Sequence, residues 1–137
     1  KMKKVNIIFD ACALIAFLNS EPGADIVESL LIDSKNKCFV HAVNLCEVFY
    51  EFIRAGDENL AQSVIDGILL MGITVREDMD TDFWKQTGRY KVKGRISLAD
   101  CFCISLASRL DGEIITSDHH EFEEIVKRDM VKVRFIR

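Results

Sequence analysis

The sequence predicts an α/β domain with a mainly parallel five-stranded sheet and helices on both faces. Short, continuous apolar runs alternate with stretches whose apolar residues recur at helical spacing. Strands that are joined through helices pair in parallel, with right-handed crossovers. No repeat, linker or composition break divides the 137 residues. We therefore expect one domain over residues 2–137, with Lys1 outside the natural chain because Met2 looks like an initiator methionine.

The first half of the chain is expected to contain two strands and three helices. Its first apolar run ends at Asp10 and is typical of a strand that is buried on both faces, and Pro22-Gly23 separates two helical patterns. The expected elements are a strand at Val5–Phe9, helices at Ala11–Leu18 and around Ala24–Ile32, a strand at Cys38–His41, and a helix from Val43 to Gly56.

The second half continues the alternation. The helix that starts at Ser97 is apolar nearly all round, which predicts a buried helix, whereas the last strand alternates in polarity, which predicts an edge strand. The expected elements are a helix through Leu60–Leu69, a strand at Ile73–Arg76, a helix around Thr81–Tyr90, a helix from Ser97 to Leu110, and strands at Glu113–Thr116 and Val131–Ile136.

Composition excludes several classes of protein. Apolar residues make up 49% of the chain and proline occurs once, which argues against a disordered chain. The N-terminal apolar run is too short for a signal peptide or a membrane span, so we expect a cytoplasmic protein with no membrane partner. The five cysteines are an odd number without zinc-site spacing, and we expect reduced thiols.

The net charge of −4 is unfavourable for a nucleic-acid-binding protein, but the charges are unevenly distributed. Residues 85–95 contain five basic side chains and no acidic one. Four of them, beside Trp84 and Tyr90, are candidates for guiding an RNA backbone, with a solvated face as the alternative. These four are Arg89, Lys91, Lys93 and Arg95.

Four acidic residues are placed to meet at one edge of the sheet. Asp10 ends the first strand, Glu47 lies in the helix after the second strand, Asp100 lies early in the buried helix, and Asp118 follows the fourth strand. Two unit charges about 4 Å apart repel by ~4 kcal/mol at an effective dielectric constant of 20. Bound Mg²⁺ or Mn²⁺ would replace this repulsion with attraction between the carboxylates and the cation. Such ions can also activate water for the hydrolysis of phosphodiesters, so that no histidine base or serine nucleophile is required.

Each acid also has a purely structural interpretation. Asp10 is placed to cap the helix that follows it, and both Ser97-x-x-Asp100 and Asp118-x-x-Glu121 have capping-box spacing. Glu47 is mid-helix and shares a face with Glu51, so a solvated helix face is its alternative.

The same residues fall in four ordered blocks that span almost the whole chain. The blocks are Ile-Ile-Phe-Asp10-Ala-Cys-Ala-Leu, Asn44-Leu-Cys-Glu47-Val-Phe-Tyr, Ser97-Leu-Ala-Asp100-Cys-Phe-Cys and Ile-Thr116-Ser-Asp118-His-His-Glu-Phe122. This set resembles PIN-domain ribonucleases, in particular the VapC-type toxins of toxin–antitoxin pairs. The resemblance implies endonucleolytic RNA cleavage that depends on Mg²⁺ or Mn²⁺, a cognate antitoxin and a homodimer. It assigns the catalytic and metal-ligand roles to Asp10, Glu47, Asp100 and Asp118.

Several residues beside the acids have possible roles at the site or in the core. Thr116 matches a hydroxyl residue of the family that would orient Asp118 or a water, with a strand-end threonine as the alternative. Cys12 departs from the family, in which serine or threonine is common. His119 and His120 are either metal ligands or phosphate contacts, or solvated loop residues. Cys101 and Cys103 are expected in the core.

Two other functions fit parts of the pattern. A phosphorelay receiver domain also ends its first strand in acid, but it requires an acid pair there and a phosphoacceptor after the third strand, whereas Asp10 stands alone and Arg76-Glu77-Asp78 follows the third strand. A catalytically silent interaction module of the PIN fold is the second alternative, and the presence of all four acids argues against it.

Overall fold

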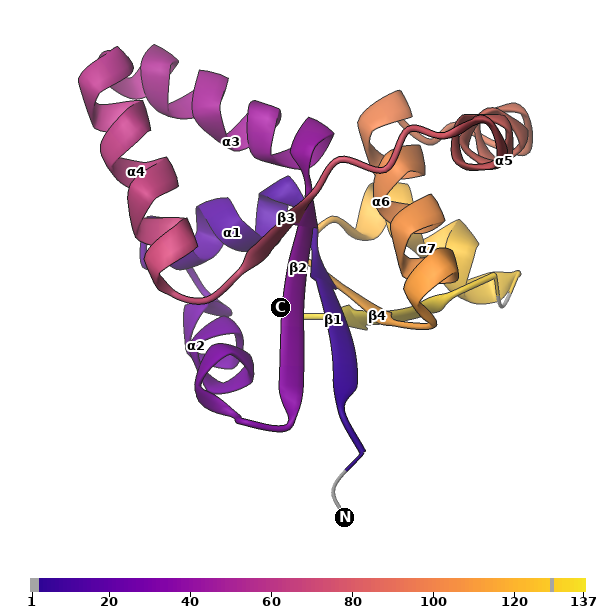
Figure 1. The fold of residues 1–137 in the computed structure, drawn as a ribbon, viewed down its shortest axis with the longest axis horizontal. Helices are drawn as coiled ribbons and strands as arrows, with labels where there is room; N and C mark the ends of the chain where they lie inside the picture. The colour runs from indigo at the N-terminus through magenta and orange to yellow at the C-terminus, as the bar shows by residue number, and fades with distance from the viewer. Residues whose placement is uncertain (1–2, 129) are drawn as a thin grey trace.

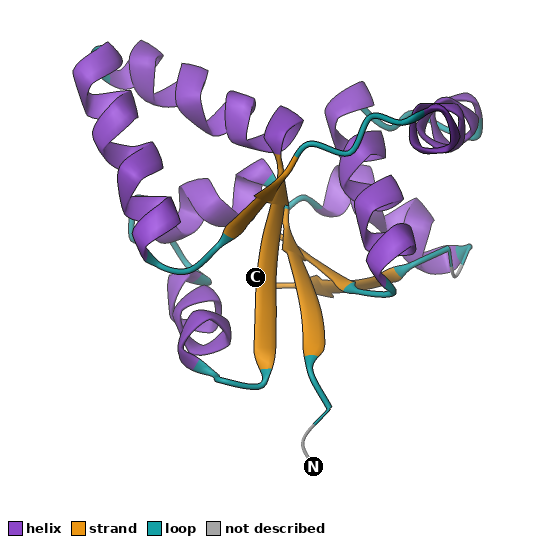
Figure 2. Ribbon diagram, viewed as in Figure 1, coloured by secondary structure: helices purple, strands orange, loops and turns teal. Residues whose placement is uncertain are grey.

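In residues 3–128 and 130–137, which the computed structural model describes, five parallel strands form one sheet in the order β3-β2-β1-β4-β5 (Figure 1; Figure 2). The strands are β1 Val5–Phe9, β2 Asn36–His41, β3 Thr74–Arg76, β4 Glu113–Thr116 and β5 Lys132–Phe135. The helices are α1 Ala11–Leu18, α2 Ala24–Ile32, α3 Ala42–Ala55, α4 Glu58–Leu70, α5 Thr81–Val92, α6 Leu98–Leu110 and α7 His119–Lys127. The α/β prediction is confirmed, with β5 at one edge.

The helices cover both faces of the sheet. The residues of β1 alternate between two cores, with Ile7 and Phe9 packed among α1 to α4 and Ile8 packed on the side of α5 to α7. Figure 1 shows the same division, with α1 to α4 on one side of the central strands and α5 to α7 on the other. All three side chains are at most 1% exposed. Burial on both faces explains why β1 reads as an unbroken apolar run.

Strand register brings β1 and β4 level at their carboxyl ends. Phe9 lies opposite Ile115, and the amide of Asp10 donates to the carbonyl of Ile115 at 3.2 Å. The residues that follow the two strands are therefore neighbours, although they are more than 100 positions apart in the chain.

One helix was not predicted. His119 and His120 were expected in a loop, but they form the first turn of α7. Asp118 caps this helix by accepting from the amide of Glu121 at 3.0 Å, and Phe122 and Ile125 anchor it in the core. Within the described residues, no helix has the length and hydropathy that a membrane span requires.

Candidate functional site

Asp10 and Asp118 are held by one threonine at the carboxyl edge of the sheet. Asp10 is 1% exposed and accepts through Oδ1 from the amide of Ala13 at 2.8 Å. The hydroxyl of Thr116 donates to Oδ2 of Asp10 and accepts from the amide of Asp118 at 2.9 Å. Thr116 therefore orients the Asp10 carboxylate and the backbone of Asp118, which is a more specific role than that of a strand-end threonine.

Asp100, Asp118 and Glu121 form the tightest group of acids. One carboxylate oxygen of each lies within 4.8 Å of the other two. The amide of Asp100 donates to Oγ of Ser97 at 3.1 Å, and the amide of Ser97 donates to Oε1 of Glu121 at 3.2 Å. The start of α6 is thus tied to the start of α7, and the amide of Ser97 positions the Glu121 carboxylate.

Sequence reasoning missed Glu121 as a candidate ligand. Its other oxygen, Oε2, is buried and has no hydrogen-bond partner in residues 3–128 and 130–137. The capping-box spacing from Asp118 was the available signal, since it places Glu121 one turn into a helix on the side of the cap.

Glu47 lies beside this group rather than within it. Its Oε1 accepts from Nδ2 of Asn44 at 3.3 Å, and the same amide nitrogen donates to the carbonyl of Ala99 at 3.1 Å. Asn44 is fully buried and thereby connects α3 to the residue before Asp100. Glu51, one turn after Glu47, is instead paired with Arg54 at 3.0 Å on the surface.

Burial and mutual repulsion make these acids unfavourable as a set of free anions. Burial raises the pKa of Asp10 to about 7, and the carboxylates of Asp118 and Glu47 add to the shift. Burial and the carboxylate of Asp10 raise the pKa of Asp100 to about 8. Burial also raises the pKa of Glu47, with Glu121 contributing. All five acids are therefore electrostatically coupled across one site.

The arrangement fits a bound divalent cation. The grouped ligand atoms are carboxylate oxygens, which Mg²⁺ and Mn²⁺ prefer, and a buried oxygen of Glu121 lacks a donor among the described residues. A cation would also offset the burial and the mutual repulsion that raise the pKa values of Asp10 and Asp100. Cys12 faces the same acids, and burial together with their charge raises the pKa of its thiol to about 12, so it remains protonated at neutral pH.

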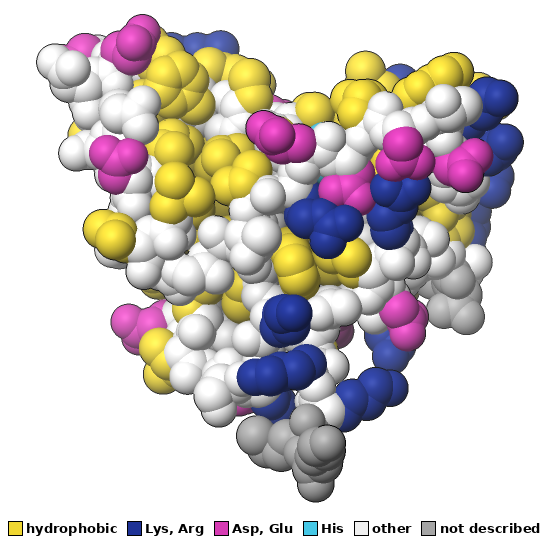
Figure 3. Space-filling view, in the orientation of Figure 1, with side chains coloured by type: hydrophobic (Ala, Val, Ile, Leu, Met, Phe, Trp, Pro, Cys, Tyr) yellow, Lys and Arg dark blue, Asp and Glu magenta, His cyan; other side chains and the backbone are white. Residues whose placement is uncertain are grey.

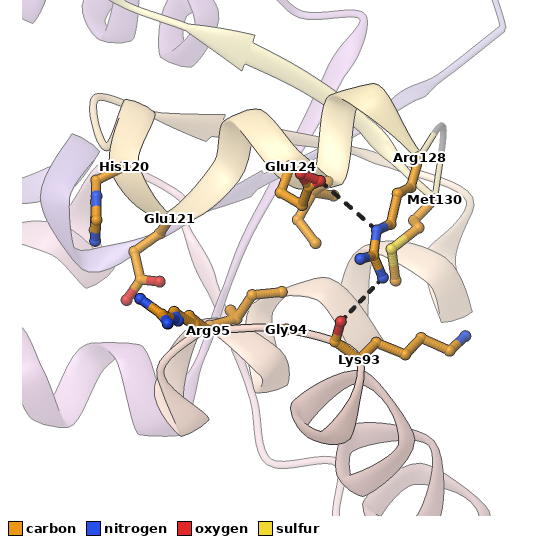
Figure 4. Close-up of a pocket in the computed structure, with 10 residues that line it drawn as sticks. Lys93, Gly94, Arg95, His120, Glu121, Glu124, Arg128 and Met130 are labelled. Carbon is orange, nitrogen blue, oxygen red and sulfur yellow. Dashed lines mark hydrogen bonds and ion pairs between the residues drawn. The ribbon is translucent and has the colours of Figure 1, made fainter.

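The four predicted RNA-binding residues do not form one surface. Arg89 donates to Oε1 of Gln86 at 3.1 Å and lines a different pocket from the one that Lys93 and Arg95 line beside Glu121 (Figure 4). Lys91 is exposed on α5, two residues after Arg89 and hence on another side of the helix. Of the two aromatic residues nearby, Trp84 is 49% exposed, whereas Tyr90 is only 5% exposed and cannot offer a stacking surface.

The histidines and cysteines that are near the acids in sequence differ in burial and in contacts. The ring of His119 stacks on Phe135 and its nitrogens contact Glu123 and the carbonyl of Arg137, so it is engaged at the C-terminal strand. The carbonyl contact with Arg137, followed by the Glu123 carboxylate, raises the pKa of His119. His120 is exposed and lines the pocket beside Glu121. Cys101 and Cys103 are buried, as expected.

Comparison with known proteins adds a family and a set of similar folds. A family model described as "PIN domain" matches residues 7–127. None of the curated proteins matches the chain. VapBC-1 from nontypeable Haemophilus influenzae is 15% identical, with a TM-score of 0.72 and coverage of 96% of this chain and 98% of that chain.

Two further solved structures have the same fold. VapBC2 from Rickettsia felis, bound to a DNA fragment from its promoter, is 15% identical with a TM-score of 0.73, covering 96% of this chain and 98% of that chain. VapC20 from Mycobacterium tuberculosis, described as a sarcin-ricin loop cleaving toxin, is 14% identical with a TM-score of 0.67, covering 86% and 94%. At these identities the likeness establishes the fold alone.

Proposed function

Because this chain belongs to the PIN-domain family, we propose that it is a metal-dependent endoribonuclease that hydrolyses RNA phosphodiesters as the toxin of a toxin–antitoxin pair. The observation that carries the proposal is the convergence of acids at the carboxyl edge of the sheet, with the oxygens of Asp100, Asp118 and Glu121 within 4.8 Å of one another. Family membership sets aside the phosphorelay receiver alternative. A catalytically silent PIN module would not be expected to keep five coupled acids.

We assign the cation-binding role to Asp100, Asp118 and Glu121, with Asp10 and Glu47 completing the site. A bound Mg²⁺ or Mn²⁺ supplies Lewis acidity toward the phosphodiester and stabilises charge on the departing oxygen. The catalytic residues are therefore the four acids identified from the sequence, together with Glu121. Hard oxygen ligands of this kind favour Mg²⁺ or Mn²⁺ over softer metals.

The protein's own contribution is to hold charged groups in place before substrate arrives. Thr116 and the amide of Ala13 engage both oxygens of Asp10, Asn44 holds Glu47, and the backbone of Ser97 holds Glu121. Groups fixed in this way need little reorganisation when charge develops in the transition state. The tight packing around Asp10 also keeps bulk water away from that carboxylate.

The proposed partners are an RNA substrate, a cognate antitoxin and a second copy of the chain. VapC20 is described as cleaving the sarcin-ricin loop, and other structures with this fold are toxin–antitoxin complexes, which supports the first two. Figure 3 shows hydrophobic side chains gathered over α3 and α4. A shallow apolar pocket there is lined by Leu45, Phe49 and Ile65, which offers an antitoxin segment an apolar surface on α3, the helix that also carries Glu47. An RNA substrate implies a cytoplasmic location.

Chelation and isosteric neutralisation test the proposal together. The purified protein should cleave a fluorescently labelled RNA with Mg²⁺ or Mn²⁺ and stop when EDTA is added. Asp100→Asn should lower the cleavage rate by about 100-fold or more, because it removes a charge that the bound cation requires. Asp25→Asn, an exposed acid on α2, is the matched control and should cleave as the wild type does. Cleavage that resists EDTA, or an Asp100→Asn protein with full activity, would overturn the assignment.

A further inference from the structure

A pocket opens directly beside the acidic site, between α7 and the loop that follows α5 (Figure 4). It has a volume of about 320 Å³, which is within the range of pockets that hold small organic ligands. Glu121 lines this pocket and also belongs to the group of three acids. A ligand in the pocket is therefore adjacent to a cation at the acidic site.

The floor of the pocket is apolar and continuous with the hydrophobic core. Ile96 and Ile125 are 4% and 1% exposed and belong to the core on this face of the sheet, and Met130 completes the floor. Flat apolar or aromatic ligands bind such a surface because both partners lose contact with water. His120, in the first turn of α7, adds an exposed imidazole at the rim.

Cationic groups stand at both ends of this floor. In Figure 4 the guanidinium of Arg95 is directed toward the carboxylate of Glu121, at the end nearest the acids. Arg128 stands at the opposite end, where it donates to the carbonyl of Lys93 at 3.0 Å and lies 3.8 Å from Glu124. The ammonium of Lys93 lies over the ring of Tyr90 and points away from the pocket.

We propose that this pocket binds one nucleotide of a single-stranded RNA substrate next to the scissile phosphate, an inference that rests on the proposed nuclease function. The base lies on Ile96, Ile125 and Met130, and the flanking phosphates contact Arg95 and Arg128. The site then presents a cation centre, an arginine, an apolar floor and a second arginine in sequence. This order matches the repeat of an RNA strand, in which each sugar carries a base and lies between two phosphates.

Charge favours RNA over an antitoxin segment as the occupant. A ligand that reaches from Arg128 to the acidic site must offer negative groups to both arginines and to a bound cation, and must place an apolar flat group between them. A nucleotide with its two phosphates does so within one repeating unit, and bases stack on or pack against protein surfaces irrespective of their identity.

Gly94 allows the floor to be blocked without a change in charge. A Cβ atom at Gly94 would lie 3.9 Å from Cγ1 of Ile96, an ordinary contact, and the backbone there is not left-handed. Gly94→Leu should therefore fold and fill the pocket. Gly88→Leu is the matched control, because Gly88 is exposed on α5 and a Cβ there meets nothing within 4 Å.

Binding and cleavage are measured with an eight-nucleotide single-stranded RNA carrying fluorescein, and with a set of the same RNA that has one abasic position at a time. Binding is followed by fluorescence anisotropy in the Asp100→Asn background, so that the RNA stays intact. In the protein that keeps Gly94, one abasic position adjacent to the cleavage site should weaken RNA binding by roughly ten-fold, which is the scale of a lost base contact. Gly94→Leu should weaken binding of the intact RNA to the same extent and should no longer distinguish the abasic RNA.

Arg95→Ala tests the phosphate contact separately. It should weaken binding and lower the slope of log affinity against log salt concentration by about one. If Gly94→Leu and Gly88→Leu bind and cleave alike, the pocket does not hold a nucleotide, and the proposal is overturned in favour of another occupant such as a protein segment. If the wild-type protein binds RNA with the expected abasic pattern but cleaves nothing with Mg²⁺ or Mn²⁺, the nuclease proposal fails while the pocket assignment stands.

Discussion

Two acidic clusters lie near the carboxyl ends of strands of the same sheet, and they are stabilised in opposite ways. After β3, Asp78 accepts two hydrogen bonds from Arg76 at 2.8 and 2.9 Å and one from Arg109 at 3.0 Å. Arg109 also donates to both oxygens of Asp80, at 2.6 and 2.9 Å. After β1 and β4, the acids have no arginine partner of this kind among the described contacts.

The pKa values express this difference. The guanidinium of Arg76, then that of Arg109, lowers the pKa of Asp78 to about 2, and Arg109 lowers the pKa of Asp80 to about 2. Burial raises the pKa of Asp10 to about 7 and that of Asp100 to about 8. A paired acid supports the fold by itself, whereas a buried unpaired acid is tolerated where a cation is expected to bind.

Neutralising one acid in each cluster should give the largest contrast. Glu121→Gln should reduce RNA cleavage by about 10²–10³-fold, because an amide cannot supply the charge that a bound cation needs. Asp80→Asn, in the paired cluster, should leave the cleavage rate within about two-fold, since its side chain is half exposed and away from the acids. Initial rates with a fluorescent RNA in Mg²⁺ measure both. Equal losses would mean that the two clusters do not differ in function.

Stability against pH should separate the clusters next. Asp10 and Asp100 have folded-state pKa values above 3.8, so between about pH 4 and pH 8 the folded protein binds more protons than the unfolded chain. The free energy of unfolding in EDTA should therefore fall as pH rises through this window, by an amount on the order of several kcal/mol. Urea titrations at pH 5.5 and 8.5 measure it.

Mg²⁺ provides the control for this pH effect. At pH 8.5 it should restore the lost stability, because the cation takes the place of the protons, and Asp100→Asn should flatten the pH dependence. A free energy of unfolding that rises from pH 5.5 to 8.5 in EDTA would contradict the assigned electrostatics.

Removing a paired acid should have a smaller effect, on stability alone. Asp78→Asn leaves two arginines with weaker acceptors at a side chain that is 8% exposed, and should cost about 2 kcal/mol in the free energy of unfolding at pH 7. The pKa of Asp78 is lowered, so its contribution is present above about pH 4 and is lost as pH falls toward 2. Urea titration at pH 7 and pH 2.5 should show a smaller difference from the wild type at the lower pH. An unchanged free energy at pH 7 would mean that the ion pairs are compensated.

The sequence was sufficient to predict the elements that position most of the site. Buried parallel strands read as continuous apolar runs, so β1 and β4 were predicted at their observed bounds, and with them the places of Asp10 and Asp118. The buried helix α6, apolar on all sides, likewise located Asp100. Because the carboxyl ends of parallel strands share one edge of the sheet, these positions alone predict that the acids meet.

Other features have a weak local signal or none. Helix α7 has only the capping-box spacing of Asp118 and Glu121 and the two buried anchors Phe122 and Ile125 among charged residues, so the helix was missed, and the place of Glu121 with it. The contact from Asn44 to Ala99 and the pair between Arg109 and Asp78 join residues 55 and 31 positions apart. Helical periodicity turns Arg89 and Lys91 toward different sides of α5, and Arg95 lies in the loop after that helix, so the basic run 85–95 does not form one surface. RNA binding by these residues stays a prediction.

The smallest expected effect concerns Glu51, which is paired with an arginine but lies close to the acids that are not. It shares a helix face with Glu47 and adds to the raised pKa of that residue, yet its side chain is half-buried and paired with Arg54. Glu51→Gln should change the free energy of unfolding by less than about 0.5 kcal/mol. It should also change the RNA cleavage rate by no more than about two-fold, whereas Glu47→Gln should lower that rate at least about ten-fold. Urea titration and the fluorescent RNA assay compare the two variants directly. Equal losses of activity would extend the functional site one helical turn along α3, since proximity to the other acids would then matter more than the pairing of Glu51 with Arg54.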